Sequence, residues 1–201
     1  MTAEEVMTGG WLVGVDAEIA QLRRGDLEAL DALLVRYQNR LYRYLLRLVR
    51  EPAAAEDLFQ QTWLRVAQQI HRYDPRHVFD AWLFTVARNL AIDYLRRHRM
   101  ESLDEPLLSG ETPAERLPAS GPDALDAVIA QERRGMLIAA LGELPAAYRE
   151  VLTLRFEEEM KLEEIAEVLA APLSTVKSRL RRGLGALRCR LEISHAAGEL
   201  S

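Results

Sequence analysis

Apolar residues recur at intervals of three and four over most of this chain, which is the spacing of one face of an α-helix. A short helix is expected from Asp16 to Arg24, ending at Gly25. Asp26 can cap a longer helix that runs to about Arg50. The apolar positions of the longer helix are Leu30, Leu33, Leu34, Tyr37, Leu41, Tyr44, Leu45 and Leu48.

Two further helices follow the same pattern. Pro52 suits the first position of a helix, where its missing N–H is no loss. The inward positions of that helix are Ala55, Leu58, Phe59, Thr62, Trp63, Val66 and Ile70. After the turn signal Asp74-Pro75, Asp80 is expected to cap another helix. The apolar residues of this helix, at steps of four, are Trp82, Val86, Leu90 and Tyr94.

The pattern then breaks between Glu101 and Asp126. This stretch has four prolines, two glycines and seven acidic residues against one arginine, a composition that favours a flexible acidic linker. Helical spacing resumes with one helix from Leu125 to Leu141 and another that opens at Pro145. The apolar positions of the first of these are Leu125, Val128, Ile129, Leu137, Ile138 and Leu141.

The last two predicted helices form a helix-turn-helix pattern. The first runs from Leu162 to Leu169, and Pro172 cannot continue it because its ring clashes with the preceding turn. Ser174, helped by Thr175, is expected to cap the second helix. The inward face of the second helix is expected to comprise Val176, Leu180, Leu184 and Leu187.

Charge sets this second helix apart from the rest of the chain. The net charge of the protein is -5, yet six Lys or Arg residues and no Asp or Glu lie between Ala171 and Leu191. A solvated surface helix is one explanation, but insertion into the major groove of DNA accounts for the turn and the cap as well. The side chains placed to reach base edges are Thr175, Ser178, Arg179 and Arg182.

A second basic feature is a stripe of arginines on one side of the first long helix, made of Arg36, Arg40, Arg43, Arg47 and Arg50. Spacing alone leaves two readings open, a solvated face or a contact with nucleic acid or an acidic protein.

Other function classes find little support. The single cysteine and the scattered histidines give no metal-ligand pattern, so no metal or cofactor is expected. Adjacent carboxylates diverge on a helix, and no phosphate loop or nucleophile motif is present, so neither an enzyme nor a small-molecule substrate is expected. No apolar run reaches the roughly 20 residues that span a bilayer, and the acidic N-terminus is unlike a signal peptide. We therefore expect a cytoplasmic protein without membrane insertion.

Three stretches together resemble the extracytoplasmic-function (ECF, group 4) sigma factors, the two-domain promoter-specificity subunits of bacterial RNA polymerase. They are AAAEDLFQQTWLRV, AWLFTVARNLAIDYLRRHR and ALGELPAAYREVLTLRFEEEMKLEEIAEVLAAPLSTVKSRLRRG, in that order along residues 17 to 193. The resemblance implies an all-α fold of two small helical domains joined by a flexible acidic linker. The implied divisions are a leader (1–15), a region 2 domain (16–100), the linker (101–124), a region 4 domain (125–194) and a tail (195–201).

The resemblance also assigns roles to residues. Core polymerase, through its clamp helices, would be bound by Asp57, Gln60 and Gln61, and the minus-10 element by Arg76, His77, Arg88, Asn89, Arg96 and Arg97. The minus-35 duplex would be bound by Ser174, Thr175, Lys177, Ser178, Arg179 and Arg182. The region 4 domain would also meet the polymerase flap, and an anti-sigma factor is implied as the regulator.

Two positions depart from the family pattern. Lys161 stands where a Ser or Thr often caps the first helix of the helix-turn-helix, and Ala170 stands where its turn often has Gly. A non-Gly residue in a left-handed turn costs on the order of 1 kcal/mol.

Two alternatives to a sigma factor remain. The first is a stand-alone helix-turn-helix regulator that binds a palindromic duplex as a dimer. The second is a helical sigma mimic that sequesters a regulator, although such a mimic needs no basic recognition helix.

Overall fold

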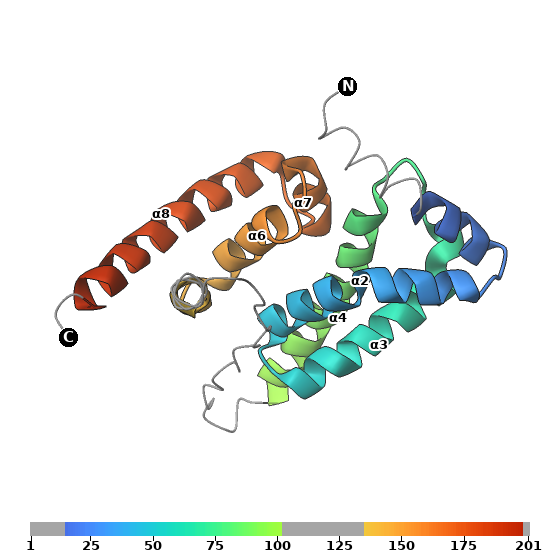
Figure 1. The fold of residues 1–201 in the computed structure, drawn as a ribbon, viewed down its shortest axis with the longest axis horizontal. Helices are drawn as coiled ribbons and strands as arrows, with labels where there is room; N and C mark the ends of the chain where they lie inside the picture. The colour runs from blue at the N-terminus through green and yellow to red at the C-terminus, as the bar shows by residue number, and fades with distance from the viewer. Residues whose placement is uncertain (1–14, 102–134, 199–201) are drawn as a thin grey trace, which may run out of the picture. The chain divides into compact units, whose positions relative to one another are not determined.

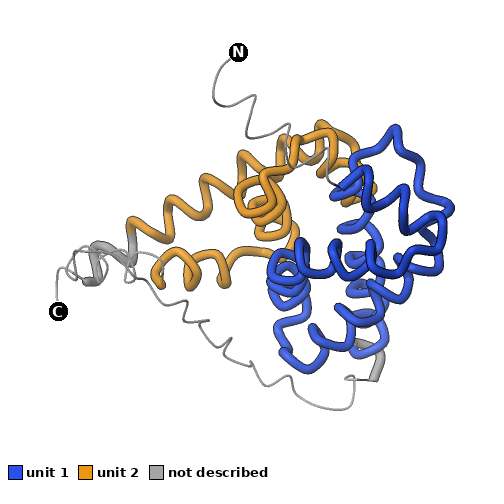
Figure 2. Tube along the Cα trace, turned by 45° about the vertical axis from the view of Figure 1, so that its right-hand side comes forward, with its two compact units in different colours: residues 1–110 blue, residues 111–201 orange. Residues whose placement is uncertain are grey.

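The computed structural model describes residues 15–101 and 135–198. The chain divides into two compact units, residues 1–110 and 111–201, each with its own core (Figure 2). Over the described residues every regular element is helical, in agreement with the predicted all-α fold. Nearly all of the expected leader and linker lies outside the described residues, as do Leu125, Val128 and Ile129, whereas the first four residues of the expected tail belong to α8.

The first unit is a bundle of three long helices, α2 (Glu28–Val49), α3 (Pro52–Gln69) and α4 (Phe79–Glu101). A shorter helix at residues 15–23 precedes them, and the 3-10 turn η1 (Ile70–Arg72) follows α3. The long helices pack against one another in all three pairs (Figure 1). Their largest fully buried side chains are Leu33, Tyr37, Leu41, Tyr44, Leu45, Val66, Leu83 and Phe84.

Local sequence sets the helix boundaries in this unit. Gly25 takes a left-handed conformation with φ of 91° and donates its N–H to the Leu22 carbonyl, which ends the helix at residues 15–23. The carboxylate of Asp26 then accepts the N–H of Glu28 at 3.0 Å. Pro52 is the first residue of α3. Gly25 and Pro52 confirm the expected boundaries, whereas the N-cap of α2 is Leu27, one residue after the expected Asp26.

The start of α4 differs from the expectation. The helix begins at Phe79, so Asp80 lies within its first turn and is not the cap. Its carboxylate instead accepts the hydroxyl of Tyr37 and lies 2.8 Å from Nη2 of Arg40, both on α2. The capping prediction was wrong because a tertiary partner holds this carboxylate.

The inward face of α4 was also predicted incorrectly. The fully buried positions are Leu83, Phe84, Ala87 and Ala91, whereas Trp82, Val86, Leu90 and Tyr94 are only half-buried. Because α4 packs against both α2 and α3, small alanines face the interior and allow close approach of the helices. Leu83 and Phe84 fill the interior beside these alanines, and the four predicted residues lie at the border of the interface.

The second unit contains a helix at residues 135–142, α6 (Ala146–Phe156), α7 (Leu162–Val168) and α8 (Leu173–Gly198). Leu141, Leu144 and Leu152 form a buried cluster, against which α8 packs Leu180, Ala186 and Leu187. At Gly183, α8 lies close against α6, since a Cβ there would lie 3.3 Å from side-chain atoms of Tyr148 and Leu152.

The turn between α7 and α8 depends on Ala170. This residue is left-handed, with φ of 46°, and its N–H donates to Glu167 while that of Ala171 donates to Ala166. Ala170 therefore occupies the conformation in which the family often has Gly. The helix ends at Val168, one residue before the predicted Leu169, and the left-handed turn at Ala170 ends it before Pro172 is reached.

The predicted cap of α8 was wrong by two residues. The carbonyl of Pro172 accepts the N–H groups of Thr175 and Val176, at 2.9 and 3.1 Å, and the helix begins at Leu173. Ser174 therefore lies inside the first turn. At the start of α7, the N–H of Lys161 donates to the carboxylate of Glu164 at 2.8 Å, which replaces part of the missing side-chain cap.

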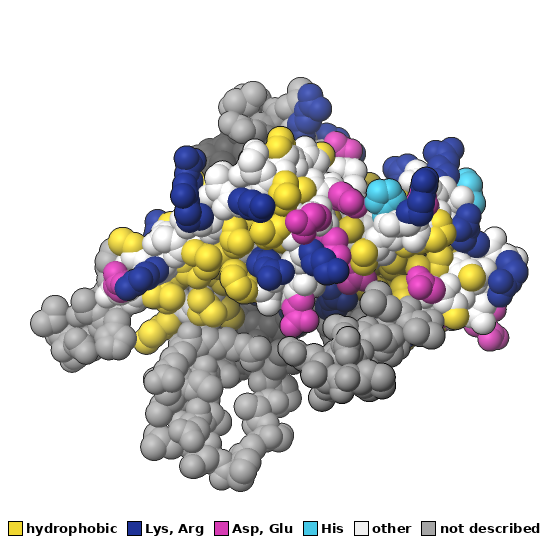
Figure 3. Space-filling model, turned by 90° about the horizontal axis from the view of Figure 1, so that it is seen from above, with side chains coloured by type: hydrophobic (Ala, Val, Ile, Leu, Met, Phe, Trp, Pro, Cys, Tyr) yellow, Lys and Arg dark blue, Asp and Glu magenta, His cyan; other side chains and the backbone are white. Residues whose placement is uncertain are grey.

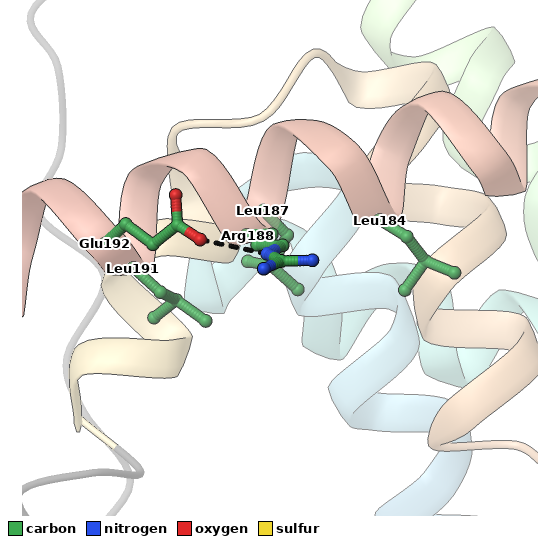
Figure 4. Close-up of a pocket in the computed structure, with 5 residues that line it drawn as sticks. All are labelled: Leu184, Leu187, Arg188, Leu191 and Glu192. Atoms are coloured by element: carbon green, nitrogen blue, oxygen red, sulfur yellow. Dashed lines mark hydrogen bonds and ion pairs between the residues drawn. The ribbon is translucent and has the colours of Figure 1, made fainter.

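Leu184 is the exception on the predicted inward face of α8. Val176 is fully buried and Leu180 and Leu187 are half-buried, but Leu184 is 41% exposed. With Leu187 and Leu191 it lines an open apolar hollow of about 470 Å³, beside the ion pair of Arg188 and Glu192 (Figure 4). The core of this unit therefore covers only part of the apolar face of α8.

Candidate nucleic-acid interface

The first three turns of α8 carry the candidate duplex-reading residues. Val176 anchors this part of the helix, since it is fully buried between the helices of the unit. Ser174, Lys177 and Arg182 are exposed, whereas Thr175, Ser178 and Arg179 are half-buried. The structure thus places all six on one short helical stretch, where three of them are exposed.

The hydroxyl of Ser178 has a local role. It donates to the carbonyl of Thr175 at 3.0 Å, so this hydrogen bond satisfies the donor within the helix. Ser178 can still accept a hydrogen bond, but its donor would have to be released to reach a base.

Arg181 is a further exposed cation that the predicted set omits. It lies seven residues after Ser174 and three after Ser178, so the three share one side of the helix. This spacing was visible in the sequence and could have identified it. Lys177, Arg181 and Arg182 therefore provide three exposed positive charges within the first ten residues of α8, suited to the phosphates that flank a major groove.

In the first unit, the candidates for single-stranded DNA lie along α4 and the loop before it. Arg76 and His77 are exposed in the loop, Asn89, Arg96 and Arg97 are exposed on the helix, and Arg88 is half-buried. Asn89 and Arg96 are seven residues apart and so lie on the same side of α4. Figure 3 shows cationic side chains beside histidines on one part of the surface that it draws.

The loop before α4 has a defined shape. The carboxylate of Asp74 accepts both the backbone N–H of Arg76, at 3.0 Å, and its side-chain Nε, at 2.9 Å. These hydrogen bonds from Arg76 lower the pKa of Asp74 to about 2. The hydroxyl of Tyr73 donates to the carbonyl of His77 at 2.6 Å, and burial raises the pKa of Tyr73. At neutral pH, Asp74 is therefore ionised and accepts these hydrogen bonds, and the hydroxyl of Tyr73 is protonated and donates one.

The candidate polymerase-binding residues form an exposed face of α3. Asp57, Gln60 and Gln61 are all exposed, on the side of the helix away from the buried Leu58 and its neighbours. Leu64 extends the same face and is 62% exposed, an apolar residue that the predicted site omitted. The sequence could have identified Leu64, because this apolar residue falls outside the inward stripe predicted for the helix. A mixed acidic, amide and apolar face suits a protein partner better than DNA.

The arginine stripe on α2 has in part a structural role. Arg36 pairs with Glu18 at 2.9 Å, which ties the short N-terminal helix to α2. Arg40 pairs with Asp80 and lies over the ring of Tyr37, with its Cζ 5.3 Å from the ring centroid. These two arginines therefore form ion pairs that join α2 to neighbouring helices of the first unit.

Other kinds of site are not found within residues 15–101 and 135–198. That part of the chain holds no group of three or more acidic, His or Cys side chains placed to bind a metal ion. Nor does it include a helix with the length and apolar character needed to cross a bilayer.

Comparison with known proteins identifies two family regions. Residues 33–101 match the Sigma-70 region 2 model and residues 134–187 match the Sigma-70, region 4 model. The ECF RNA polymerase sigma factor SigW of Bacillus subtilis is 32% identical over 180 residues, covering 88% of this chain and 96% of SigW. SigM of the same organism is also 32% identical, over 76% of this chain and 89% of SigM.

Solved structures share the fold. A sigma factor RpoE from Bartonella quintana, in complex with the anti-sigma factor NepR, matches with a TM-score of 0.66 and 24% identity, over 81% of this chain and 96% of that one. CnrH in complex with the cytosolic domain of CnrY matches with a TM-score of 0.63 and 22% identity, over 90% and 98%.

Proposed function

Because this chain belongs to the ECF family of RNA polymerase sigma factors, we propose that its two units divide promoter recognition between the surfaces described above. As a sigma factor it binds core RNA polymerase and directs transcription initiation at specific promoters. The proposal concerns the residues that carry out each part. We assign the domain limits 16–100 and 125–194 to these two tasks, with 101–124 as the connection.

The second unit would read the minus-35 duplex through the start of α8. The observation that carries this assignment is the cluster of exposed cations Lys177, Arg181 and Arg182 directly after a helix-turn-helix turn. Ser174, Thr175, Ser178 and Arg179 complete the surface. Cations in this position neutralise phosphates and leave neighbouring side chains at the base edges.

The first unit would hold the minus-10 element and the polymerase clamp on different helices. Arg76, His77 and Asn89 are exposed along the loop and α4, where unstacked bases and their phosphates could be bound together with Arg88, Arg96 and Arg97. The face of α3 around Asp57, Gln60, Gln61 and Leu64 would contact core polymerase. Separate helices allow one unit to hold DNA and polymerase at the same time.

Regulation and location follow from the family. The structurally similar RpoE is bound to an anti-sigma factor, and we propose that an anti-sigma factor also holds this protein inactive. We further propose that it acts in the cytoplasm and has no catalytic activity of its own, as expected of a subunit that directs another enzyme to promoters.

The test is in vitro transcription with purified core RNA polymerase on a pool of genomic promoter fragments. New start sites that appear only with the protein, and share two upstream elements, are the expected result. A folded protein that neither binds core polymerase nor yields new transcripts, but binds a palindromic duplex as a dimer, would instead identify a stand-alone regulator.

A further inference from the structure

Tyr73, the first residue of the loop between η1 and α4, links the two ends of this loop. Tyr73 is buried. Its ring packs edge-on against Phe79, with centroids 5.6 Å apart, and at a tilt against Trp82, with centroids 5.4 Å apart. From this position its hydroxyl donates to the carbonyl of His77, four residues later, at 2.6 Å. The ring is thus held by the aromatic cluster, and the hydroxyl holds the far side of the loop.

Asp74 makes a second set of bonds inside the same loop. Its carboxylate accepts the N–H of Arg76 at 3.0 Å and the guanidinium Nε at 2.9 Å, while its carbonyl accepts the N–H of His77 at 3.0 Å. Pro75, between them, restricts the backbone further. The loop therefore has its shape before any DNA is bound.

These bonds orient Arg76 without burying it. Its side chain is 88% exposed, although Nε and Nη2 both face the carboxylate of Asp74. An exposed arginine normally samples many rotamers, and a partner that binds it must restrict them. The Asp74 carboxylate removes much of that freedom in advance.

We propose that Tyr73 and Asp74 are positioning residues for minus-10 recognition, which hold Arg76 and His77 in place for the opened DNA strand. The inference rests on the proposed function, since it deepens the role assigned to the loop. Neither positioning residue need touch DNA. The consequence is selectivity: a loop held in one shape distinguishes the correct minus-10 sequence from others better than a loop that adapts to each.

The experiment uses the full chain with core polymerase and measures initiation on a matched promoter and on one with a mutated minus-10 element. The readout is the ratio of the two rates, because a general change in attraction to phosphates cancels in it. Tyr73→Phe removes one hydroxyl with no change of charge, and Asp74→Asn weakens the link to Arg76. We expect each variant to lower the ratio by about threefold to tenfold, the range that corresponds to ordering one long side chain.

A double-variant series tests whether Asp74 acts through Arg76. In an Arg76→Ala background, Asp74→Asn should change the ratio by less than about 1.5-fold, because the side chain that it positions is already missing. Tyr42→Phe, a half-buried tyrosine on α2, is the matched control and should leave the ratio unchanged. Core affinity and tryptophan fluorescence should stay at wild-type values in every variant.

The outcomes separate the two proposals. If the wild-type protein transcribes normally but Tyr73→Phe and Asp74→Asn leave the ratio unchanged, the inference is wrong and the proposed function stands. Equal effects of Asp74→Asn with and without Arg76 would likewise overturn it. Absence of promoter-dependent transcripts with the wild-type protein would overturn the proposed function and, with it, this inference.

Discussion

The hydroxyl of Tyr37 on α2 donates a hydrogen bond to the carboxylate of Asp80 in the first turn of α4. Arg40 approaches the other oxygen of the same carboxylate at 2.8 Å. Burial and then the charge of Asp80 raise the pKa of Tyr37, so the phenol stays protonated and serves as a donor. Residues 43 positions apart in the sequence thereby join α2 to α4 through one buried phenol and one carboxylate.

We expect Tyr37→Phe to lower the free energy of unfolding of the first unit by about 1.5–3 kcal/mol, because a hydrogen bond to a charged group is lost while the ring stays in place. Urea unfolding followed by tryptophan fluorescence measures this unit alone, since Trp11, Trp63 and Trp82 all precede residue 110. Tyr42→Phe is the control. A loss no larger than in the control would show that the bond contributes little to stability.

The same tyrosine should make the first unit sensitive to alkaline pH. The pKa of Tyr37 is raised above its ordinary value of 10.0 in the fold, so its stabilising contribution is complete below pH 10 and declines above it. Between pH 10 and 11 the loss approaches about 1.4 kcal/mol per pH unit. Tyr37→Phe should reduce the slope of stability against pH by this amount, and parallel slopes would contradict the assignment.

Ala170→Gly should stabilise the second unit by about 0.5–1 kcal/mol, because glycine adopts the left-handed conformation of this turn without a Cβ clash. Amide hydrogen exchange measures this effect, because Ala170→Gly should increase the protection of backbone amides in α7 and α8. Ala166→Gly, at a right-handed position inside α7, should destabilise by about 1 kcal/mol. Changes of the same sign in both variants would refute the role of the left-handed turn.

Gly183 and Gly185 of α8 should respond differently to substitution by alanine. At Gly185 a Cβ meets nothing within 4 Å, so Gly185→Ala should gain the helix propensity of about 0.8–1 kcal/mol. At Gly183 the Cβ would contact Tyr148 and Leu152 at 3.3 Å, and this crowding should remove most of the gain. Amide hydrogen exchange in α8 compares the stability of the two variants. Equal gains in stability would mean that α6 moves to accommodate the added methyl group.

Arg182→Ala should reduce initiation from promoters with an intact minus-35 element, with a loss of about 1–3 kcal/mol in recognition, and leave core affinity unchanged. Asp57→Ala should do the reverse, weakening core binding while the isolated minus-35 contact is spared. Arg188→Ala is a matched control, because Arg188 is on the same helix and pairs with Glu192. Transcription titrated with core polymerase separates the two effects. A loss of core affinity in Arg182→Ala would contradict the division of roles.

Much of this protein follows from local sequence. Helical spacing places α2 and α3, Gly25 and Pro52 set boundaries, and the apolar and basic pattern after Ala170 identifies the helix-turn-helix. These features depend on residues within about one or two helical turns of one another, so a linear pattern contains them. The three motifs in order were sufficient to identify the sigma factor family.

Only the tertiary structure decided which partners the polar side chains take. Asp80 bonds to Tyr37 and Arg40 across the bundle instead of capping its own helix, and Arg36 pairs with Glu18 instead of facing solvent. The face of α4 that is buried likewise depends on packing against two helices at once. Charge and spacing show that a side chain can form an ion pair, but the partner is determined by which helices the fold brings together, because an ion pair needs atoms within a few ångströms.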